Sequence, residues 1–549
     1  MKIKFKIVIR LACLLHEHWR APFISTPKPA GRTLRITRAM FGLAVVGLVF
    51  CFFIAFSQAR DVTITILHTT DIHGHITGLS LDGKKGGLLR CSTIIRRIRE
   101  QEPNVLLIDI GDLIQGTAVS FFSKGNVMMD AVRILHYDAL IPGNHEFDWG
   151  TANLRNLYRR AGIPVLIANC SSSNPDGFVF SGSQPFMIWK LDGVCVAIVG
   201  LTTPNIPHWS RPFLLEDLRF EQSVSALRRI MPYVRNKKPD VLVLAVHQGY
   251  RKWGDNSANE INSIARSFPE FDVILGGHTH KTFVRRELNR VTYTQAGCYG
   301  LWLGKVQLIV DTNRHCVKNK TVELLPVDDS VSPDRELKSR LAKPLSKAET
   351  YLNKTIGWSG HKHLAESCFP GQSQIQMLIA RAIADAVDAD VVFHGVFTDK
   401  VLNRGPITMR DVWWIVPYEN YIGIAHLTLP ELQTILEENS KYLETRNFRG
   451  VYGITYDLYP DKAPGSRVRN IRFINNRRIQ NHARVKVAIN SYDMASGGNR
   501  FPRLRDIIDQ PLSRLERTGV TTKDAVVKYI KKHNPLNEQA VMGARLLQK

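Results

Sequence analysis

From Val62 onward the chain alternates short apolar runs with amphipathic stretches. Apolar runs rich in β-branched residues and bounded by polar or glycine-rich sequence predict buried strands. Such strands are expected at residues 63–68, 104–110, 139–141, 164–168, 194–200, 241–246 and 273–275. Between them, apolar positions at helical spacing predict amphipathic helices over 88–100 and 223–235. The pattern is typical of a layered α/β fold whose strands are buried on both faces.

The same pattern divides the chain into domains. A polar stretch at 328–330 closes the first α/β region, one amphipathic helix is expected over 334–353, and a new α/β pattern runs from 355 to about 530. We therefore predict a first domain over residues 60–333, an interdomain helix over 334–354 and a second, mixed α/β domain over 355–530. The remaining segment, 531–549, is polar and basic, and we expect it to fray as a tail.

A basic segment and then an apolar one precede the α/β pattern. Residues 1–39 carry nine Lys or Arg and one Glu, and an uncharged run follows over Met40–Ala59. That run ends in Ser57-Gln58-Ala59, a small-x-small pattern of the kind that signal peptidase cleaves, and it is also just long enough to span a membrane. Residues 1–59 are therefore expected to be a signal peptide or a membrane anchor. The rest of the chain would then lie outside the cytoplasm, either periplasmic or membrane-anchored and facing outward.

Net charge and cysteine content narrow the function classes. The formal net charge of the chain is +24, of which residues 1–39 account for +8. The remainder is spread through the exported part, where it suits an anionic phosphate ester, and we predict no nucleic-acid partner. The eight cysteines form no C-x-x-C pair, which argues against a zinc ribbon or a dithiol redox motif. A metal site must therefore be sought among His, Asp and Asn.

Polar side chains collect in five loops, each placed directly after a predicted strand, where α/β folds carry functional groups. The loops contain Asp71-Ile72-His73, Gly111-Asp112, Gly143-Asn144-His145-Glu146-Phe147-Asp148, His247-Gln248-Gly249 and Gly277-His278-Thr279-His280. Imidazole together with carboxylate or amide oxygen, without thiolate, suits Zn, Mn, Fe or Co. Asp112 is the natural bridge between two cations, because one carboxylate can hold two ions about 3.5 to 4 Å apart, a spacing that supports phosphoryl transfer.

In this order the motifs D-x-H, G-D, G-N-H-E, a single His and G-H-T-H resemble those of the calcineurin-like metallophosphoesterases. The extension of the third motif to Asp148, the export signal and the second domain resemble the exported 5′-nucleotidase branch, which includes UDP-sugar hydrolases and 2′,3′-cyclic nucleotide phosphodiesterases. The resemblance covers about residues 62–530. It implies a metallophosphoesterase β-sandwich flanked by helices, followed by the second mixed α/β domain.

The resemblance also implies two divalent metal ions and a catalytic histidine. One metal would be held by Asp71, His73, Asp112 and His280, and the other by Asp112, Asn144, His247 and His278. His145 would contact the substrate phosphate and stabilise its developing charge, and Asp148 would orient His145.

In this family the second domain supplies a nucleoside pocket. Phe448 and Tyr492 fall in stretches similar to those that carry the two base-stacking aromatics, Asn499 stands where a ribose-binding aspartate is usual, and Arg500 follows it. The chain departs from the family at 371–376 and 393–400, where no arginine occupies the expected phosphate-binding places. Arg500, Arg449 and Lys400 are candidate substitutes.

These implications favour a two-metal phosphoesterase that acts on a nucleotide or a related small-molecule phosphate ester. Two alternatives remain. One is a thiosulfohydrolase-like sulfur-oxidation enzyme of the same architecture, and the other is a surface binding protein that has lost turnover.

Overall fold

The structure, a computed structural model, describes residues 61–78, 85–173, 179–180, 182–210, 212–365, 372–445, 447–497, 500–539 and 543–547. The expected leader at 1–59 lies outside these ranges. Within them, no helix has the length and apolar character that a membrane span requires.

The first domain is built around two sheets. One has the strand order β13-β12-β1-β2-β3 and the other has the order β10-β11-β9-β8-β6-β5. The strands of the first are β1 (Asp61–Thr69), β2 (Val105–Asp109), β3 (Ala139–Leu140), β12 (Trp302–Asp311) and β13 (Cys316–Pro326). Those of the second are β5 (Phe186–Leu191), β6 (Val194–Leu201), β8 (Val241–Val246), β9 (Val273–Gly276), β10 (Thr282–Leu288) and β11 (Val291–Ala296).

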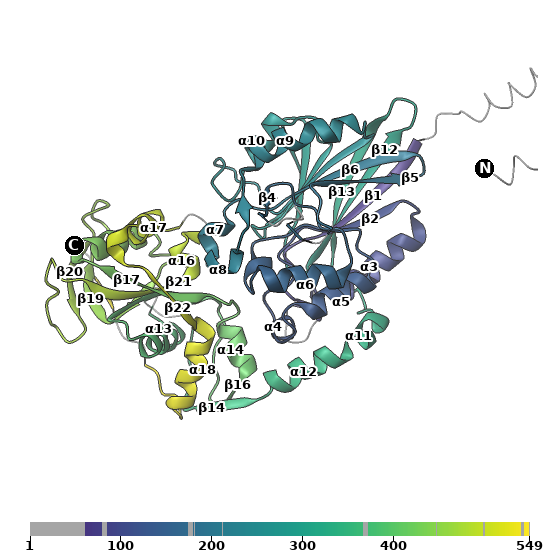
Figure 1. Ribbon diagram of the computed structural model, residues 1–549. Coiled ribbons are helices and arrows are strands. Elements are labelled where there is room, and N and C mark those ends of the chain that lie inside the picture. Colours follow the sequence, from purple (N-terminus) through teal and green to yellow (C-terminus); the bar gives the residue numbers. More distant parts are fainter. Residues whose placement is uncertain are drawn as a thin grey trace, which may run out of the picture. The chain divides into compact units, whose positions relative to one another are not determined.

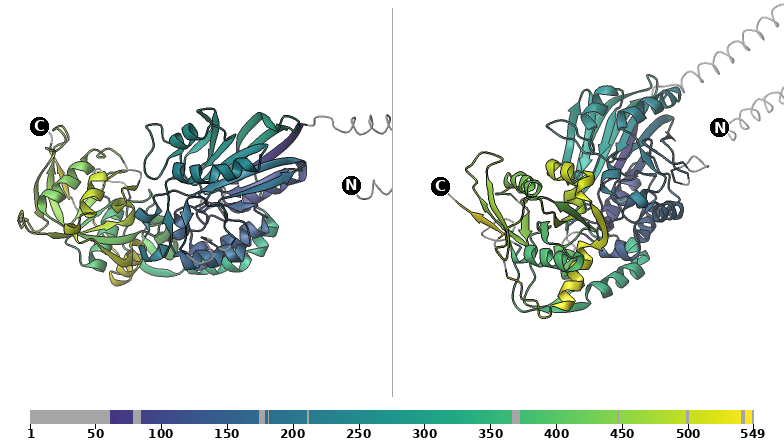
Figure 2. Two further views of the ribbon diagram at one scale, coloured as in Figure 1. Left: turned by 45° about the horizontal axis from the view of Figure 1, so that its top comes forward. Right: turned by 60° about the vertical axis from the view of Figure 1, so that its left-hand side comes forward.

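The two sheets pack face to face and helices cover their outer sides. Ile64 and Ile108 of the first sheet belong to one buried cluster with Ile198 and Val243 of the second. Helices α3 (Leu88–Gln101), α5 (Asn126–Ile134) and α6 (Thr151–Ala161) pack in a cluster on one outer side, and α9 (Ser223–Asn236) and α10 (Ile261–Ser267) pack in another on the opposite side (Figures 1 and 2). The predicted β-sandwich flanked by helices is confirmed.

Strand register brings the functional loops to one edge. β1, β2 and β3 are mutually parallel, with Thr69 opposite Asp109 and Asp109 opposite Leu140. In the second sheet β6, β8 and β9 are also parallel, with Val246 opposite Gly276. Because parallel strands end at the same edge of a sheet, the five polar loops begin at matching levels.

The expected strand at 164–168 is wrong. Val165 and Leu166 make only isolated bridges, to Leu140 and Gln184. The backbone N–H groups of Leu166, Ile167 and Ala168 donate to three different partners, the carbonyls of Leu140, Gln184 and Gly200. A segment that divides its hydrogen bonds in this way forms no continuous ladder.

The segment expected to be one helix over 334–353 is two helices, α11 (Arg335–Arg340) and α12 (Ala342–Leu352). They are separated at Leu341, whose backbone has φ −100° and ψ 8°. Pro344 explains the break, because it has no N–H to donate to the carbonyl of Arg340 and its ring crowds the preceding turn.

The second domain is mixed α/β, as predicted. Its main sheet has the order β18-β15-β21-β17-β22, from β15 (Val391–His394), β17 (Tyr421–Leu427), β18 (Gly450–Tyr452), β21 (Val485–Asn490) and β22 (Glu516–Thr521). The smaller sheets are β14 (Thr355–Ser359) with β16 (Gly405–Thr408), and β20 (Val468–Phe473) with β19 (Ile454–Leu458) and β23 (Ala544–Leu546). The surrounding helices include α13 (Gln374–Val387), α14 (Met409–Ile415), α15 (Leu429–Ser440), α17 (Pro502–Ile508) and α18 (Thr522–Lys532).

The expected fraying of the C-terminal segment is also wrong for its described residues. β23 pairs in parallel with β19, with Ala544 opposite Tyr456. Leu536 is fully buried, and the Glu538 carboxylate accepts a hydrogen bond of 2.7 Å from the Tyr529 hydroxyl. The segment therefore belongs to the second domain, because its few apolar residues find partners in it.

Candidate metal centre and substrate cavity

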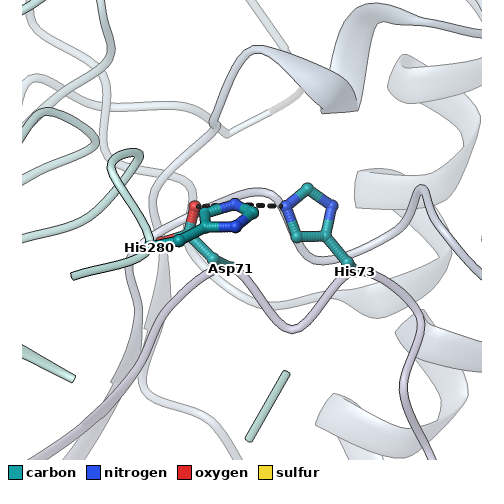
Figure 3. A group of neighbouring side chains, drawn as sticks. All are labelled: Asp71, His73 and His280. Carbon is teal, nitrogen blue, oxygen red and sulfur yellow. Dashed lines mark hydrogen bonds and ion pairs between the residues drawn. The ribbon is translucent and has the colours of Figure 1, made fainter. Parts of the chain in front are cut away.

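Asp71, His73 and His280 form one compact group of ligand atoms (Figure 3). The Nε2 atoms of His73 and His280 lie 3.0 Å apart, and Asp71 Oδ1 lies 3.4 Å from His280 Nε2. Asp71 and His73 come from the loop after β1, and His280 follows β9. Three loop residues from two sheets thus point at one small volume.

Asp112, His247 and His278 form a second such group. Asp112 Oδ2 lies 3.2 Å from His247 Nε2 and also 3.8 Å from His73 Nε2 in the first group. Among the residues that the structure describes, Asn144 Oδ1 and His278 Nδ1 are buried and have no hydrogen-bond partner. Buried polar atoms normally have partners, so these orphaned atoms, together with the nitrogen and oxygen donor set, fit divalent cations.

The backbone of these loops is held in a costly conformation. Asp71, His73, Asp112, His278 and His280 all have positive φ, between 50° and 71°. Non-glycine residues rarely adopt this left-handed region, and strain of this kind concentrates at functional sites. Five of the seven predicted metal ligands therefore depend on the surrounding structure to hold their backbone in place.

Hydrogen bonds to the backbone orient two of the histidines. His73 Nδ1 lies 2.9 Å from the carbonyl oxygen of Gln115, and His247 Nδ1 lies 2.6 Å from that of Ile110. A ring that donates from Nδ1 to a carbonyl keeps the Nε2 lone pair free for a metal. Burial also lowers the pKa values of His73 and His278 to about 3, which favours the neutral imidazole that a cation needs. At His247 and His280 the neighbouring carboxylates of Asp112 and Asp71 outweigh burial and raise the pKa.

Glu146 organises the loops around Asp112, a role that the sequence argument did not assign to it. Its carboxylate, 1% exposed, accepts hydrogen bonds from the N–H groups of Asp112 (2.8 Å), Leu113 (2.7 Å) and Gly143 (2.7 Å). Gly143 must lack a side chain here, because a Cβ would lie 2.3 Å from Asp112 Oδ1. The place of Glu146 in the motif G-N-H-E indicates such a role, because a glutamate among metal ligands either binds the metal itself or holds the ligands in position.

His145 lies beside the second group and pairs with Asp148. His145 begins a short 3₁₀ turn that Asp148 follows, and His145 Nδ1 lies 2.8 Å from Asp148 Oδ2. The backbone N–H of His145 donates to Asp112 Oδ1 at 2.8 Å, which fixes the turn against the metal centre. Burial disfavours the charged imidazole, but the carboxylates of Asp148 and Asp112 outweigh burial and raise the pKa of His145 to about 9.

A cavity of about 1440 Å³ connects this centre with the second domain. It is lined by His145 and His278 from the first domain and by Tyr418, Tyr492 and Arg500 from the second. Tyr492 is 41% exposed, and the Arg500 guanidinium lies 5.3 Å from the centre of its ring. Asn499, also expected to bind substrate, lies outside the described residues.

Phe448, the other aromatic predicted to stack on the base, also lines this cavity but is largely covered. It is 3% exposed and packs in the hydrophobic core of the second domain with Phe393 and Leu436, so only a small part of its side chain faces the cavity. Tyr418 is the aromatic that the sequence argument missed. It lines the cavity, and its hydroxyl lies 3.3 Å from that of Tyr299 in the first domain.

The arginines considered as phosphate ligands differ in availability. Arg449 is buried and makes two hydrogen bonds to Asp493, Nε to Oδ2 at 2.8 Å and Nη2 to Oδ1 at 2.9 Å. Its Nε and Nη2 are therefore engaged by Asp493, although Arg449 also lines the cavity. Lys400 is exposed, while Arg500 lines the cavity.

Comparisons with known proteins agree with this architecture. The family model for calcineurin-like phosphoesterases matches residues 64–282, and that for the 5′-nucleotidase C-terminal domain matches residues 354–506. The chain is 27% identical over 508 residues to the 5′-nucleotidase of Bos taurus, covering 82% of this chain and 85% of that protein.

Two other proteins are similar to this chain over different shares of their own length. Endonuclease YhcR of Bacillus subtilis is 24% identical over 504 residues, which are 86% of this chain but 40% of that protein, so the chain spans less than half of that relative. The structure of a 5′-nucleotidase precursor from Thermus thermophilus superposes with a TM-score of 0.68 at 21% identity, covering 88% of this chain and 99% of that one.

Proposed function

Because the chain belongs to the 5′-nucleotidase family and is a metal-dependent hydrolase of phosphate esters, we propose that it acts on nucleotides with two divalent metal ions. The observation that carries the proposal is the position of Asp112, whose Oδ2 faces His247 of one ligand group and His73 of the other. One carboxylate between two nitrogen-rich groups is the arrangement that a two-metal site requires.

In this proposal the ligands divide as the sequence motifs suggest. Asp71, His73, Asp112 and His280 would hold one ion, and Asp112, Asn144, His247 and His278 the other. The ions, of Zn, Mn, Co or Fe, would supply positive charge against a phosphate ester and its transition state. The strained loops that carry these side chains hold them in position before substrate arrives.

His145 would bind the phosphate through its Nε2 N–H. Its Nδ1 donates to Asp148, which fixes the ring orientation, and Asp112 anchors the backbone of the same turn. Although burial opposes it, Asp148 raises the pKa of His145, which favours an imidazole with a proton on both nitrogens. It would thus stabilise negative charge on the reacting phosphate, with Asp148 as its positioning residue.

The nucleoside would lie between the domains. Tyr418 and Tyr492 both line the cavity, and base stacking on an aromatic ring contributes about 1 to 3 kcal/mol per base. Arg500 lies over one side of Tyr492, close enough to contact a phosphate or the base. The name of the bovine relative, a 5′-nucleotidase, supports this substrate class.

We also propose that the enzyme works outside the cytoplasm, periplasmic or anchored to the membrane, because residues 1–59 combine a basic segment, an apolar run and a small-x-small site. Cell fractionation of the full chain and of a chain lacking residues 1–59 would test this. Retention of both in the cytoplasm would contradict it.

Activity is tested by purifying residues 60–549 with Mn, Co or Zn in excess and assaying four substrates. AMP, a UDP-sugar, 2′,3′-cyclic AMP and p-nitrophenyl phosphate separate nucleotide specificity from general phosphoesterase activity. Metal-dependent hydrolysis of at least one nucleotide, at a higher kcat/KM than the nitrophenyl ester, is expected. Hydrolysis of none, with two ions bound per chain, would instead favour the sulfur-oxidation hydrolase or the binding protein.

A further inference from the structure

A second, open hollow of about 510 Å³ adjoins the metal centre on the first domain. Its lining includes Lys252, Phe283 and Arg286. Three more of its lining residues, Tyr250, His280 and Lys281, also line the main cavity. The hollow therefore adjoins the main cavity, in which a substrate phosphate would lie, and the nucleotide roles proposed above leave it unused.

Aromatic rings hold the Arg286 guanidinium in place. Its central carbon lies 4.6 Å from the ring centre of Tyr250 and 5.8 Å from that of Phe283. Such contacts fix a cation without neutralising it, because a ring carries no net charge. The neighbouring Arg285 behaves differently, since its Nε donates to Glu287 Oε1 at 2.8 Å.

Within the described part of the chain, the positive charge of this hollow has no counter-ion. Throughout the described ranges, no carboxylate lies within ion-pair distance of Lys252, Lys281 or Arg286, whereas Arg235 pairs with Glu270 and Lys318 with Asp61 elsewhere in the domain. Three unpaired cations beside a metal centre would raise the local concentration of anions. Trp253, 88% exposed beneath Lys252, adds an open aromatic surface.

We propose that this hollow binds a second phosphate group of the substrate, carried next to the phosphate that reacts. The hollow is lined by first-domain residues, while Tyr418 and Tyr492, proposed for the base, belong to the second domain. The two substituents of the reacting phosphate would thus lie over different domains. A nucleoside monophosphate leaves the hollow empty, whereas a nucleoside diphosphate or the end of an oligonucleotide fills it.

The inference rests on the proposed function and is tested with the double variant Lys252→Gln/Arg286→Gln. AMP carries one phosphate. In ADP the α-phosphate would react: water attacks its phosphorus, the anhydride bond breaks, and the β-phosphate leaves the hollow as inorganic phosphate, with AMP as the other product. In a 5′-phosphorylated dinucleotide water would attack the internal diester and one nucleoside would leave, while the 5′-monoester is the second phosphate. For at least one of the latter two, the ratio of its kcat/KM to that of AMP should fall about tenfold in the variant, the scale of one or two lost charge-assisted hydrogen bonds. The substrate whose ratio falls identifies the source of the second phosphate.

A matched control removes two positive charges elsewhere. Lys343→Gln/Lys347→Gln on α12 changes two exposed lysines that line neither hollow, and its ratios should match the wild type. Equal ratios in both double variants would overturn the inference even while AMP is hydrolysed. If AMP is not hydrolysed, the proposed function fails, but the hollow can still be tested by calorimetric titration with ADP and AMP. We then expect weaker ADP binding in the Lys252→Gln/Arg286→Gln variant and unchanged ADP binding in the control variant.

Discussion

His145 Nδ1 lies 2.8 Å from Asp148 Oδ2, and the turn that joins them is fixed by the hydrogen bond from the His145 N–H to Asp112. Replacing His145 with Asn should lower kcat by about 10² to 10⁴, the usual range for a residue that acts directly on the reacting group. Asp148→Asn keeps the shape but loses the charge, so we expect a smaller loss, about tenfold to a hundredfold.

Metal content distinguishes this role from a structural one. Neither His145 nor Asp148 belongs to a ligand group, so both variants should retain the metal-to-protein ratio of the wild type. Elemental analysis alongside steady-state kinetics makes the comparison. Wild-type turnover in His145→Asn would remove that residue from the mechanism.

Asp112→Asn should disturb both ligand groups at once, because the Asp112 carboxylate faces His247 at 3.2 Å and His73 at 3.8 Å. An amide carries no charge and coordinates two cations poorly. We expect bound metal, measured by elemental analysis after dialysis, to fall from about two ions per chain to below one. Asp329→Asn, at an exposed position, is the control. An unchanged metal-to-protein ratio in Asp112→Asn would contradict the proposal that Asp112 binds both ions.

The metal centre could be predicted from the sequence because each ligand motif directly follows a predicted strand. Asp71, Asp112 and His278 each follow a run of apolar residues, and parallel strands bring those run ends together whatever the details of the helices. The positive φ of these residues could not be foreseen, since it arises from contacts between loops.

The substrate side could not be derived in the same way. An aromatic residue has the same local pattern whether it packs in a core or lines a cavity. Only the tertiary structure shows that Tyr418 lines the cavity together with Phe448, which is mostly buried in the core. The pairing of Arg449 with Asp493 was equally hidden, because 44 residues separate the partners. Pro344 indicates the break at Leu341, but the amphipathic spacing continues across Pro344 and so predicted a single helix.

Gly497 allows the Tyr492 ring to lie against the backbone. A Cβ at position 497 would fall 2.3 Å from ring carbon Cζ of Tyr492, so Gly497→Ala must displace that ring. If Tyr492 contacts the base, KM for AMP should rise about fivefold to tenfold, the cost of weakening one stacked contact, while KM for p-nitrophenyl phosphate changes little. Gly519→Ala, where a Cβ meets open space, is the control. Equal changes for both substrates would exclude a role in base binding.

Asp493 is the only carboxylate that pairs with Arg449 in the described chain, and both side chains are buried. Breaking a buried pair leaves an uncompensated charge, so Asp493→Asn should lower the free energy of unfolding of the second domain by about 3 to 5 kcal/mol. Denaturant titration followed by circular dichroism measures this. Asp388→Asn, whose partner Lys486 is exposed, should change stability by less than about 1 kcal/mol. A similar small effect at Asp493 would mean that Arg449 finds solvent or another acceptor.

Lys523 on α18 makes stability depend on pH above neutrality. It is 5% exposed, its Nζ lies 2.7 Å from Glu419 Oε1, and burial lowers its pKa from 10.5 to about 8 although Glu419 opposes the shift. Between those two values the unfolded chain binds a proton here that the folded chain has released. The folded state therefore gains stability as pH rises from about 8 to 10.5, and it loses that contribution as pH falls through 8.

Comparison with Lys523→Met isolates this contribution, because the variant has no proton to release. The free energy of unfolding of the wild type, relative to that of the variant, should rise by up to about 3 kcal/mol across this pH range, at 1.36 kcal/mol per pKa unit. Lys528→Met, exposed on the same helix, measures what the loss of a surface lysine does alone. A wild-type advantage over Lys523→Met that stays constant from pH 8 to 10.5 would show that Lys523 keeps its charge in the folded state, with Glu419 and the Trp413 ring, 2.9 Å from Nζ, compensating for burial.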